Sequence, residues 1–143
     1  MKTRTILSAF LICLGLVAWS SFSLAQRISE ESIFGVWEVE GTILGDNGEG
    51  FVLPHKHSAP DCGKDHTQFT EEFTAKDVKY KEDCSPVENE FSWKLEENTL
   101  TLTKGERSVQ WHILSIEDGQ MKVGIQVRPD SENRMYVSYK KRE

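Results

Sequence analysis

The sequence predicts an all-β protein: a single antiparallel up-and-down β-barrel, a meander of about eight strands. Two observations support this fold class. After Gln26 no stretch keeps the three- and four-residue apolar spacing of an amphipathic helix, whereas apolar and polar residues alternate with a period of two in many short runs. Segments rich in Gly, Asp, Asn and Pro separate these runs and favour tight turns. A meander of this length tends to close on itself, because closure removes exposed strand edges.

The strands are predicted from the alternating runs, and the turns from the polar segments between them. The runs lie at residues 37–40, 78–83, 91–96, 99–103, 109–113, 121–127 and 135–139. A further strand is expected to hold Phe69, Glu71 and Phe73 on one face. The predicted turns lie at residues 45–50, 74–77, 96–99, 104–107, 117–120 and 128–133. Residues 45–66 are long and irregular, which predicts a binding or lid segment over the barrel mouth.

The N-terminal residues have the layout of a secretory signal peptide. Lys2 and Arg4 precede an apolar run at residues 6–19, and small residues further on predict cleavage after Ala25. The run is shorter than the roughly 20 apolar residues of a membrane span, so a retained anchor is the less favoured alternative. We therefore expect a secreted or periplasmic protein with a signal peptide at 1–25, a polar lead-in at 26–32 and one barrel domain at 33–143.

The charge of the chain limits its partners. It has 17 Lys and Arg residues against 23 Asp and Glu residues, a formal charge of −6. Cleavage after Ala25 would remove Lys2 and Arg4 but no acidic residue, which takes the charge to −8. An acidic surface without a basic stripe argues against nucleic acid and anionic membranes as partners.

Two cysteines, Cys62 and Cys84, would remain after cleavage. An even number in an oxidising compartment predicts a disulfide. The bond would close a loop of about 22 residues and contribute about 3 kcal/mol in the chain-entropy model. An oxidised Cys62 also excludes a Cys-His catalytic pair, which needs a free thiolate.

Six aromatic residues fall on the apolar side of their predicted strands and are expected to converge inside the barrel as candidate ligand contacts: Trp37, Phe69, Tyr80, Phe91, Trp93 and Trp111. An eight-stranded barrel is just wide enough to be filled by its own side chains or to hold one small ligand. Two descriptions of the barrel interior are therefore compatible with the sequence. One is a filled core, and the other is a cavity whose flat aromatic walls would suit a small apolar or aromatic molecule.

Three of the four histidines lie in the segment HKHSAPDCGKDH at 55–66: His55, His57 and His66. In an extended strand the first two would face the same way with Cα atoms about 6.6 Å apart. Asp61 or Asp65 would then offer a carboxylate to a zinc or copper ion. Because the spacing matches no fixed zinc-site pattern, a solvated polar loop is the favoured interpretation, and no metal or other cofactor is predicted.

The remaining polar candidates have ordinary explanations. Glu71 and Glu82 share strand faces with apolar neighbours, and we expect both at the barrel rim, in water. His112 alternates with apolar neighbours and should face solvent. The sequence contains no phosphate loop, nucleophile elbow, paired helical histidines or calcium loop, so no enzyme is predicted.

Three features follow one another in a recognisable order. GVW at 35–37 opens the first strand, Cys62 and Cys84 bracket one hairpin, and FSWKLEENTLTLT at 91–103 follows. This order resembles the small secreted lipocalin-like domains of bacteria, over roughly residues 33–127. The resemblance implies a calyx with one open mouth, in many relatives with a cavity for a small apolar molecule. It also implies that a basic side chain of the last strand, Lys140 or Arg142, stacks on Trp37 at the closed end.

The leading hypothesis is a lipocalin-like binding protein that holds a small apolar or aromatic ligand in its barrel. The alternative is a protein-interaction module, an inhibitor or an envelope assembly factor, with a filled barrel and residues 45–66 as its contact surface. Metal buffering by His55, His57 and His66 is the least favoured hypothesis.

Overall fold

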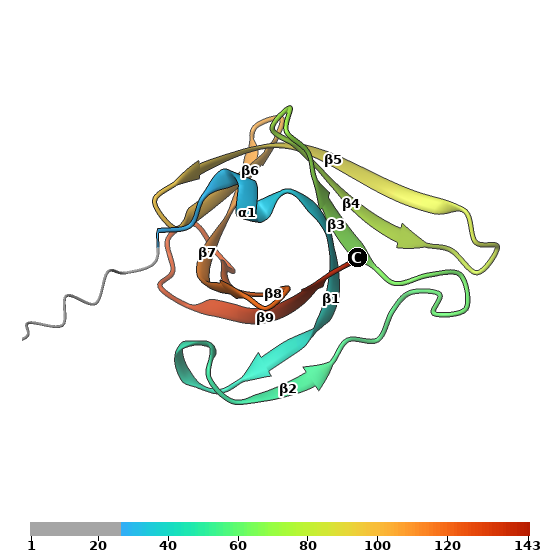
Figure 1. Cartoon of the computed structure of the whole chain (residues 1–143), viewed down its shortest axis with the longest axis horizontal. Coiled ribbons are helices and arrows are strands. Elements are labelled where there is room, and N and C mark those ends of the chain that lie inside the picture. The colour runs from blue at the N-terminus through green and yellow to red at the C-terminus, as the bar shows by residue number, and fades with distance from the viewer. Residues whose placement is uncertain (1–26) are drawn as a thin grey trace, which may run out of the picture.

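The computed structural model describes residues 27–143, so the predicted signal peptide at residues 1–25 lies outside the described part of the chain. A short helix, α1 (Glu30–Ile33), precedes nine strands (Figure 1). These are β1 (Gly35–Leu44), β2 (Phe51–Pro54), β3 (His66–Phe69), β4 (Thr74–Tyr80), β5 (Pro86–Glu96), β6 (Thr99–Lys104), β7 (Arg107–Glu117), β8 (Gln120–Gln126) and β9 (Arg134–Lys141). Within residues 27–143, no helix has the length and apolar character needed to cross a membrane.

Eight of the strands form a closed antiparallel barrel. From β3 to β9 each strand pairs with the next one in the chain, and β1 closes the ring by pairing with both β3 and β9. Only β2 stands outside the ring, where it pairs with the second half of β1. The prediction of an up-and-down barrel of about eight strands is therefore confirmed.

One edge of β1 changes partner along its length. Its first residues, Gly35–Glu38, pair with β3, and its last residues, Gly41–Leu44, pair with β2. Between these stretches, Val39 N–H donates to the carbonyl oxygen of Asp65 (3.1 Å), and His55 N–H donates to the carbonyl oxygen of Glu40 (2.8 Å). Residues 55–65 therefore form a loop whose two ends meet side by side on β1.

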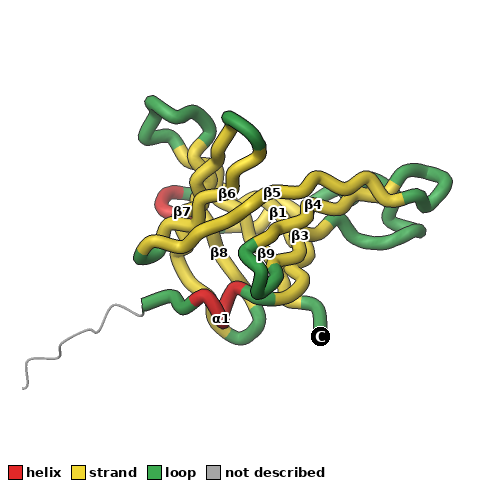
Figure 2. Tube along the Cα trace, turned by 90° about the horizontal axis from the view of Figure 1, so that it is seen from above, coloured by secondary structure: helices red, strands yellow, loops and turns green. Residues whose placement is uncertain are grey.

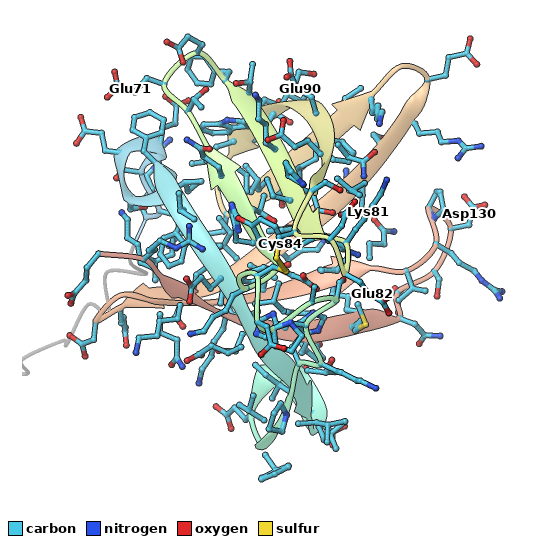
Figure 3. The ribbon with its side chains drawn as sticks, turned by 90° about the vertical axis from the view of Figure 1, so that its right-hand side faces the viewer. Glu71, Lys81, Glu82, Cys84, Glu90 and Asp130 are labelled. Carbon is cyan, nitrogen blue, oxygen red and sulfur yellow. A yellow bond between two sulfur atoms is a disulfide. The ribbon has the colours of Figure 1, made fainter. Side chains whose placement is uncertain are left out.

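The first turns differ from the sequence prediction. The predicted strand over 69–73 and the predicted turn at 74–77 are wrong, because β3 ends at Phe69 and β4 begins at Thr74. The turn between them is closed by a hydrogen bond from Thr70 N–H to the carbonyl oxygen of Thr74 (2.9 Å). Glu71 in this turn and Glu82 in the β4–β5 turn are both exposed, as expected for rim positions (Figure 3).

Helix α1 closes one end of the barrel. Its last residue, Ile33, is fully buried, and the next ring, that of Phe34, packs edge-on against Trp93 with centroids 5.9 Å apart. Figure 2 shows α1 and the C-terminus at the same end of the barrel. Because the strands alternate in direction, the β4–β5, β6–β7 and β8–β9 turns lie at the opposite, open end.

Candidate functional site

The closed half of the barrel is filled by aromatic side chains. Four of the six predicted interior rings are buried: Trp37, Phe69, Trp93 and Trp111. The Phe69 ring lies at the centre of the group, edge-on to Trp93 (centroids 5.8 Å apart) and to Trp111 (6.0 Å). This half of the interior is packed core.

A basic side chain of the last strand lies on the Trp37 ring, as the family resemblance implied, but it belongs to Lys141. The ammonium group of Lys141 lies 5.3 Å from the centroid of the Trp37 ring. Lys141 takes this place because it pairs directly with Trp37 across β1 and β9, so both side chains project from the same face. The predicted residues Lys140 and Arg142 fall on the other face, where Arg142 Nε donates to Glu38 Oε1 at 2.8 Å.

An open cavity of about 470 Å³ lies against the inner face of β5, β6 and β7, next to Phe91, the fifth predicted ring. Phe91, Leu102 and Val109 line it from three neighbouring strands, on the same face as the buried Trp93, Leu100 and Trp111. The remaining lining residues are polar: Asn89, Lys104, Arg107 and Ser108. The Lys104 ammonium group donates to Asn89 Oδ1 (2.8 Å) and lies 5.7 Å from the centroid of the Phe91 ring. The cavity therefore has an apolar wall and a polar rim.

Tyr80, the sixth predicted ring, lies on the outer face of the barrel. Ala75 faces inward, since it is fully buried and pairs with both Phe69 and Phe91. Strand side chains alternate, so Tyr80, an odd number of residues away, faces outward. There its ring packs beside His66, with centroids 6.3 Å apart, and a Cβ atom added to Gly63 would lie 2.8 Å from it. The predicted interior position of Tyr80 is wrong because the 55–65 loop covers this part of the outer face.

Two polar side chains that the sequence patterns did not single out face the interior. Asp77 follows Ala75 on the inner face of β4 and pairs with Thr67 on β3 and Asn89 on β5. Burial raises the pKa of Asp77 above its usual value, and the nearby charge of Asp65 adds to this, while Lys79 partly opposes it. Tyr139 on β9 is 5% exposed and stacks on Trp111, with ring centroids 5.2 Å apart. Burial also raises the pKa of Tyr139, and the charge of Asp77 raises it further.

The 55–65 loop is held by a disulfide bond and by a hydrogen-bonded clasp formed by His55, Ser58 and Asp65. Cys62 and Cys84 form the predicted disulfide, which joins the loop to the β4–β5 turn at the open end (Figure 3). At the neck of the loop, His55 Nε2 lies 2.9 Å from the buried carboxylate of Asp65, which also accepts hydrogen bonds from the backbone N–H and hydroxyl of Ser58. Burial would raise the pKa of Asp65, but its hydrogen bonds with His55 and Ser58 outweigh this effect and lower it.

The clasp brings together a different set of groups from the three histidines of the metal hypothesis. Possible ligand atoms of His55, His57 and Asp65 lie within 4.8 Å of one another. His66 is not part of this set, and its Nδ1 lies 2.9 Å from the carbonyl oxygen of Lys64. In the clasp, His57 Nδ1 accepts the Asp65 N–H (3.0 Å), which leaves the proton of a neutral ring on Nε2. His55 Nε2 is hydrogen-bonded to one carboxylate oxygen of Asp65, so each of the three residues already makes a hydrogen bond within the protein.

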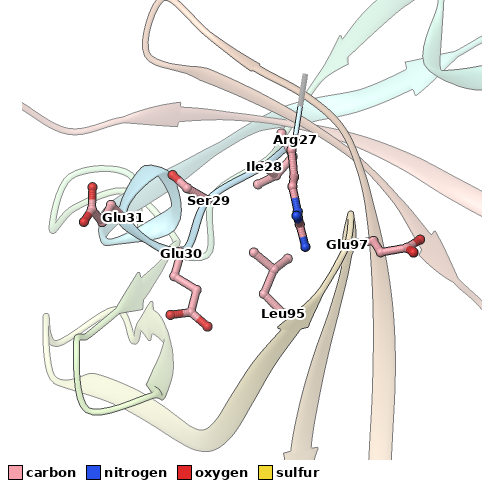
Figure 4. Close-up of a pocket in the computed structure, with 7 residues that line it drawn as sticks. All are labelled: Arg27, Ile28, Ser29, Glu30, Glu31, Leu95 and Glu97. Carbon is pink, nitrogen blue, oxygen red and sulfur yellow. The ribbon is translucent and has the colours of Figure 1, made fainter. Parts of the chain in front are cut away.

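The other hollows on the described surface are more polar. One of about 440 Å³ lies at the closed end, between residues 27–31 and the β5–β6 turn, and Figure 4 shows Glu31 and Glu97 pointing outward on its opposite sides. Another, of about 410 Å³, lies beside the β8–β9 turn and includes His112. His112 is partly exposed, and its pKa is lowered by partial burial and by the charge of Arg134.

Comparison with known proteins agrees with this architecture. A family model described as a lipocalin-like domain matches residues 33–123, well over half of the chain. The chain belongs to the lipocalin-like domain family. A search of curated proteins finds no significant match. Lipocalin-like domains are typically non-enzymatic binding proteins, and the barrel is of a ligand-binding type.

Proposed function

We propose that this lipocalin-like domain binds a small apolar or aromatic molecule non-covalently, without catalysis, in the open half of its barrel. The observation that carries the proposal is the cavity of about 470 Å³ lined by Phe91, Leu102 and Val109. Ligand pockets usually have volumes of about 300–1,000 Å³, mostly apolar walls and a few fixed polar groups. The polar rim, where Lys104 is held by Asn89, supplies such groups.

The packed half of the barrel supports the same proposal. Its edge-on aromatic contacts hold the inner wall rigid behind the cavity. A rigid wall needs little ordering when a ligand binds, which lowers the entropic cost of association. Of the two interiors that the sequence left open, we therefore favour a barrel that is filled at one end and open to a ligand at the other.

Fluorescence titration with N-phenyl-1-naphthylamine, a neutral apolar dye that brightens in apolar surroundings, tests the proposal. The informative variant is Val109→Glu, which puts a charged side chain on the cavity wall. Its matched control is Gln110→Glu, which adds the same carboxylate one residue away on the exposed opposite face of β7. We expect the dye to bind the natural protein and the control alike, and at least about tenfold more weakly to Val109→Glu.

Two results would overturn this assignment. One is a natural protein that leaves the dye emission unchanged and carries no additional mass in native mass spectrometry after purification from its own source. The other is dye binding that Val109→Glu does not weaken.

We also propose that the protein is exported and works in the periplasm or outside the cell. A disulfide and the absence of a membrane-crossing helix among residues 27–143 are compatible with this. Mass spectrometry of the protein from its own source should give Gln26 as the first residue. An N-terminus that still carries the apolar run would contradict export with cleavage.

One observation favours a second candidate function, the capture of a partner protein. The β1–β2 hairpin exposes three apolar side chains, with Leu44 53%, Phe51 68% and Leu53 51% exposed. They lie beside β2, the edge strand of the sheet, whose outer hydrogen-bonding groups could pair with a strand of a partner. Phe51 and Leu53 belong to the segment 45–66 that the sequence indicated as a contact surface, and Leu44 lies directly before it.

A photo-crosslinking amino acid at position 51 tests this candidate in cells of the protein's source. We expect a single crosslinked partner that is lost when Leu53 is replaced by Ser. It should be retained when Val127, a somewhat more exposed apolar residue at the start of the β8–β9 turn, is replaced by Ser. Crosslinks that are absent, or that both variants leave unchanged, would count against partner capture through this hairpin.

A further inference from the structure

Two positively charged side chains face each other at the rim of the cavity. Lys104 ends β6 and Arg107 begins β7, and the two residues pair directly across this hairpin, so their side chains project from the same face. It is the inner face, because Leu102 and Val109 of the cavity wall form the pair two residues away. Like charges directly opposite each other destabilise a sheet. The hairpin therefore has an arrangement that folding by itself does not favour.

Neither cation of the rim is neutralised by a carboxylate of the described residues. Among the ion pairs within 4.0 Å in residues 27–143, none includes Lys104 or Arg107, and Glu106, in the turn between them, takes part in none either. Asp77 also lies on the inner face, but on β4, which β5 separates from β6, and the charge of Lys79 already acts on it. Both rim cations are therefore available to a negative group from outside the chain.

The side chain of Lys104 is held beside the apolar wall of the cavity. Its ammonium group donates to Asn89 Oδ1 (2.8 Å) and lies 5.7 Å from the centroid of the Phe91 ring. The bond with Asn89 uses one of its N–H groups and leaves the others for a ligand. The guanidinium group of Arg107 is a planar fork of donors that matches the two oxygens of a carboxylate. The rim therefore offers donors for an anionic group next to a flat apolar surface.

We propose that the ligand of this barrel is an amphipathic anion, a small molecule with an apolar or aromatic body and a carboxylate that Lys104 and Arg107 bind. This inference rests on the proposed function and specifies its ligand class. The body of the molecule would lie against Phe91, Leu102 and Val109. A cationic ligand would be repelled at the rim, and a neutral one would leave the two facing cations without a partner. Because the chain as a whole carries a formal charge of −6, the attraction for an anion has to come from this local pair.

Calorimetric titration with two probes of the same shape tests the charge requirement. The first probe is 1-naphthaleneacetate, and the second is 1-naphthaleneacetamide, which has a neutral amide in place of the carboxylate. We expect the carboxylate to bind the natural protein at least about fivefold more tightly at low ionic strength, because both rim cations are exposed and such ion pairs are worth less than buried ones. Sodium chloride at about 0.5 M should shrink this preference, since salt screens exposed charges.

Two double variants with the same change of charge separate the rim from the rest of the surface. Lys104→Gln with Arg107→Gln removes both rim cations and should bind the two probes equally. Lys94→Gln with Lys140→Gln removes two cations from exposed positions on the outer face, on β5 and β9, and should keep the preference for the carboxylate. The rim variant lacks the like-charge contact, so urea unfolding should show no loss of stability.

The outcomes distinguish this inference from the function on which it rests. Equal affinities for the two probes in the natural protein, or a preference that the rim variant keeps or the outer-face variant loses, would overturn the anion assignment alone. A rim variant that is less stable than the natural protein would also count against it, because the two cations would then serve folding. Binding of N-phenyl-1-naphthylamine with no binding of either naphthalene probe would overturn it too. Failure of all three compounds would overturn the proposed ligand-binding function as well.

Discussion

The indole N–H of Trp37 donates a hydrogen bond to the carbonyl oxygen of Ile33, 2.7 Å away, and so joins α1 to the first strand of the barrel. Ile33 and Trp37 are both fully buried, which means that no water molecule is available to replace either partner. This bond and the Lys141 side chain hold the Trp37 ring from two sides at the closed end.

Trp37→Phe tests this closure. The ring is largely kept, but the carbonyl oxygen of Ile33 loses its donor, so we expect a loss of about 1–3 kcal/mol in the free energy of unfolding measured with urea. Trp93→Phe removes a similar bond, to the carbonyl oxygen of Thr74 (3.1 Å), in a partly exposed place, and should cost less. An equal or larger loss for Trp93→Phe would contradict the difference that we assign to burial.

The loop clasp predicts a stability effect that disappears in acid. Asp65→Ala leaves the N–H groups of His55 and Ser58 without their acceptor and should cost about 1–3 kcal/mol at neutral pH. Because the folded pKa of Asp65 lies below 3.8, its contribution is complete above pH 3.8 and is lost as the pH falls further. Urea unfolding at several pH values measures this. The exposed Asp61→Ala should show neither effect, and a deficit in Asp65→Ala that persists at pH 2 would argue against the clasp.

The disulfide should stabilise the whole fold but order only one region. The bond joins residues 22 positions apart, for which the chain-entropy model gives about 3 kcal/mol. In a Cys62→Ser, Cys84→Ser double variant we expect that loss in urea unfolding. Hydrogen exchange should speed up in residues 55–65 and the β4–β5 turn, while β6 to β8 remain protected. Faster exchange spread evenly over all strands would show that the bond does more than tether the loop.

Asp77→Asn should make the protein more stable at neutral pH. Its raised pKa means that the ionised form is disfavoured by folding, so stability rises as the pH falls toward 3.8. Replacing the charge with a neutral amide should therefore add about 0.5–2 kcal/mol at neutral pH, because burial disfavours the charged form. The gain should shrink as the pH is lowered to 4. A variant that is less stable at pH 7 would show that the hydrogen bond between Thr67 and the carboxylate outweighs the cost of burying the charge.

The fold class was predictable from the sequence because alternation with a period of two persists through most of the chain. It indicates strands wherever one face is buried and the other is wet, as in β6 and β8. The cysteine count was similarly sufficient for the Cys62–Cys84 bond. Both signals are local or compositional, so neither depends on knowing how strands are placed relative to one another.

The alternation of apolar and polar residues could not by itself identify the inner face of β4. Val78 and Tyr80 are the larger apolar residues of this strand, yet they face outward, because the disulfide-tethered loop covers that surface. The inner face carries Ala75 and Asp77, and both fell within a stretch that was predicted to be a turn. Asp77 was therefore missed as an interior residue. A small residue and an acid give no apolar signal, so the pattern could not show that they face the interior.

Register is the second property that the sequence pattern did not contain. The family resemblance indicated a basic residue of the last strand on Trp37, and the identity of that residue depends on which position of β9 pairs with it. A shift of one residue exchanges the two faces of a strand. The β-bulge between Val39 and Gly41 alters the pairing of β1 with β9. The alternation of apolar and polar residues in the two strands does not indicate this bulge.

The position of β2 outside the closed ring has a consequence for altering this protein. Every barrel strand already has two neighbours without it, since β1 is paired with β3 and β9. The tip of the hairpin, residues 45–50, can therefore be exchanged for foreign sequence without opening the cylinder, provided that the buried Gly48 is kept. An engineered receptor could carry one specificity in its interior and a second, independently chosen one on this appendage.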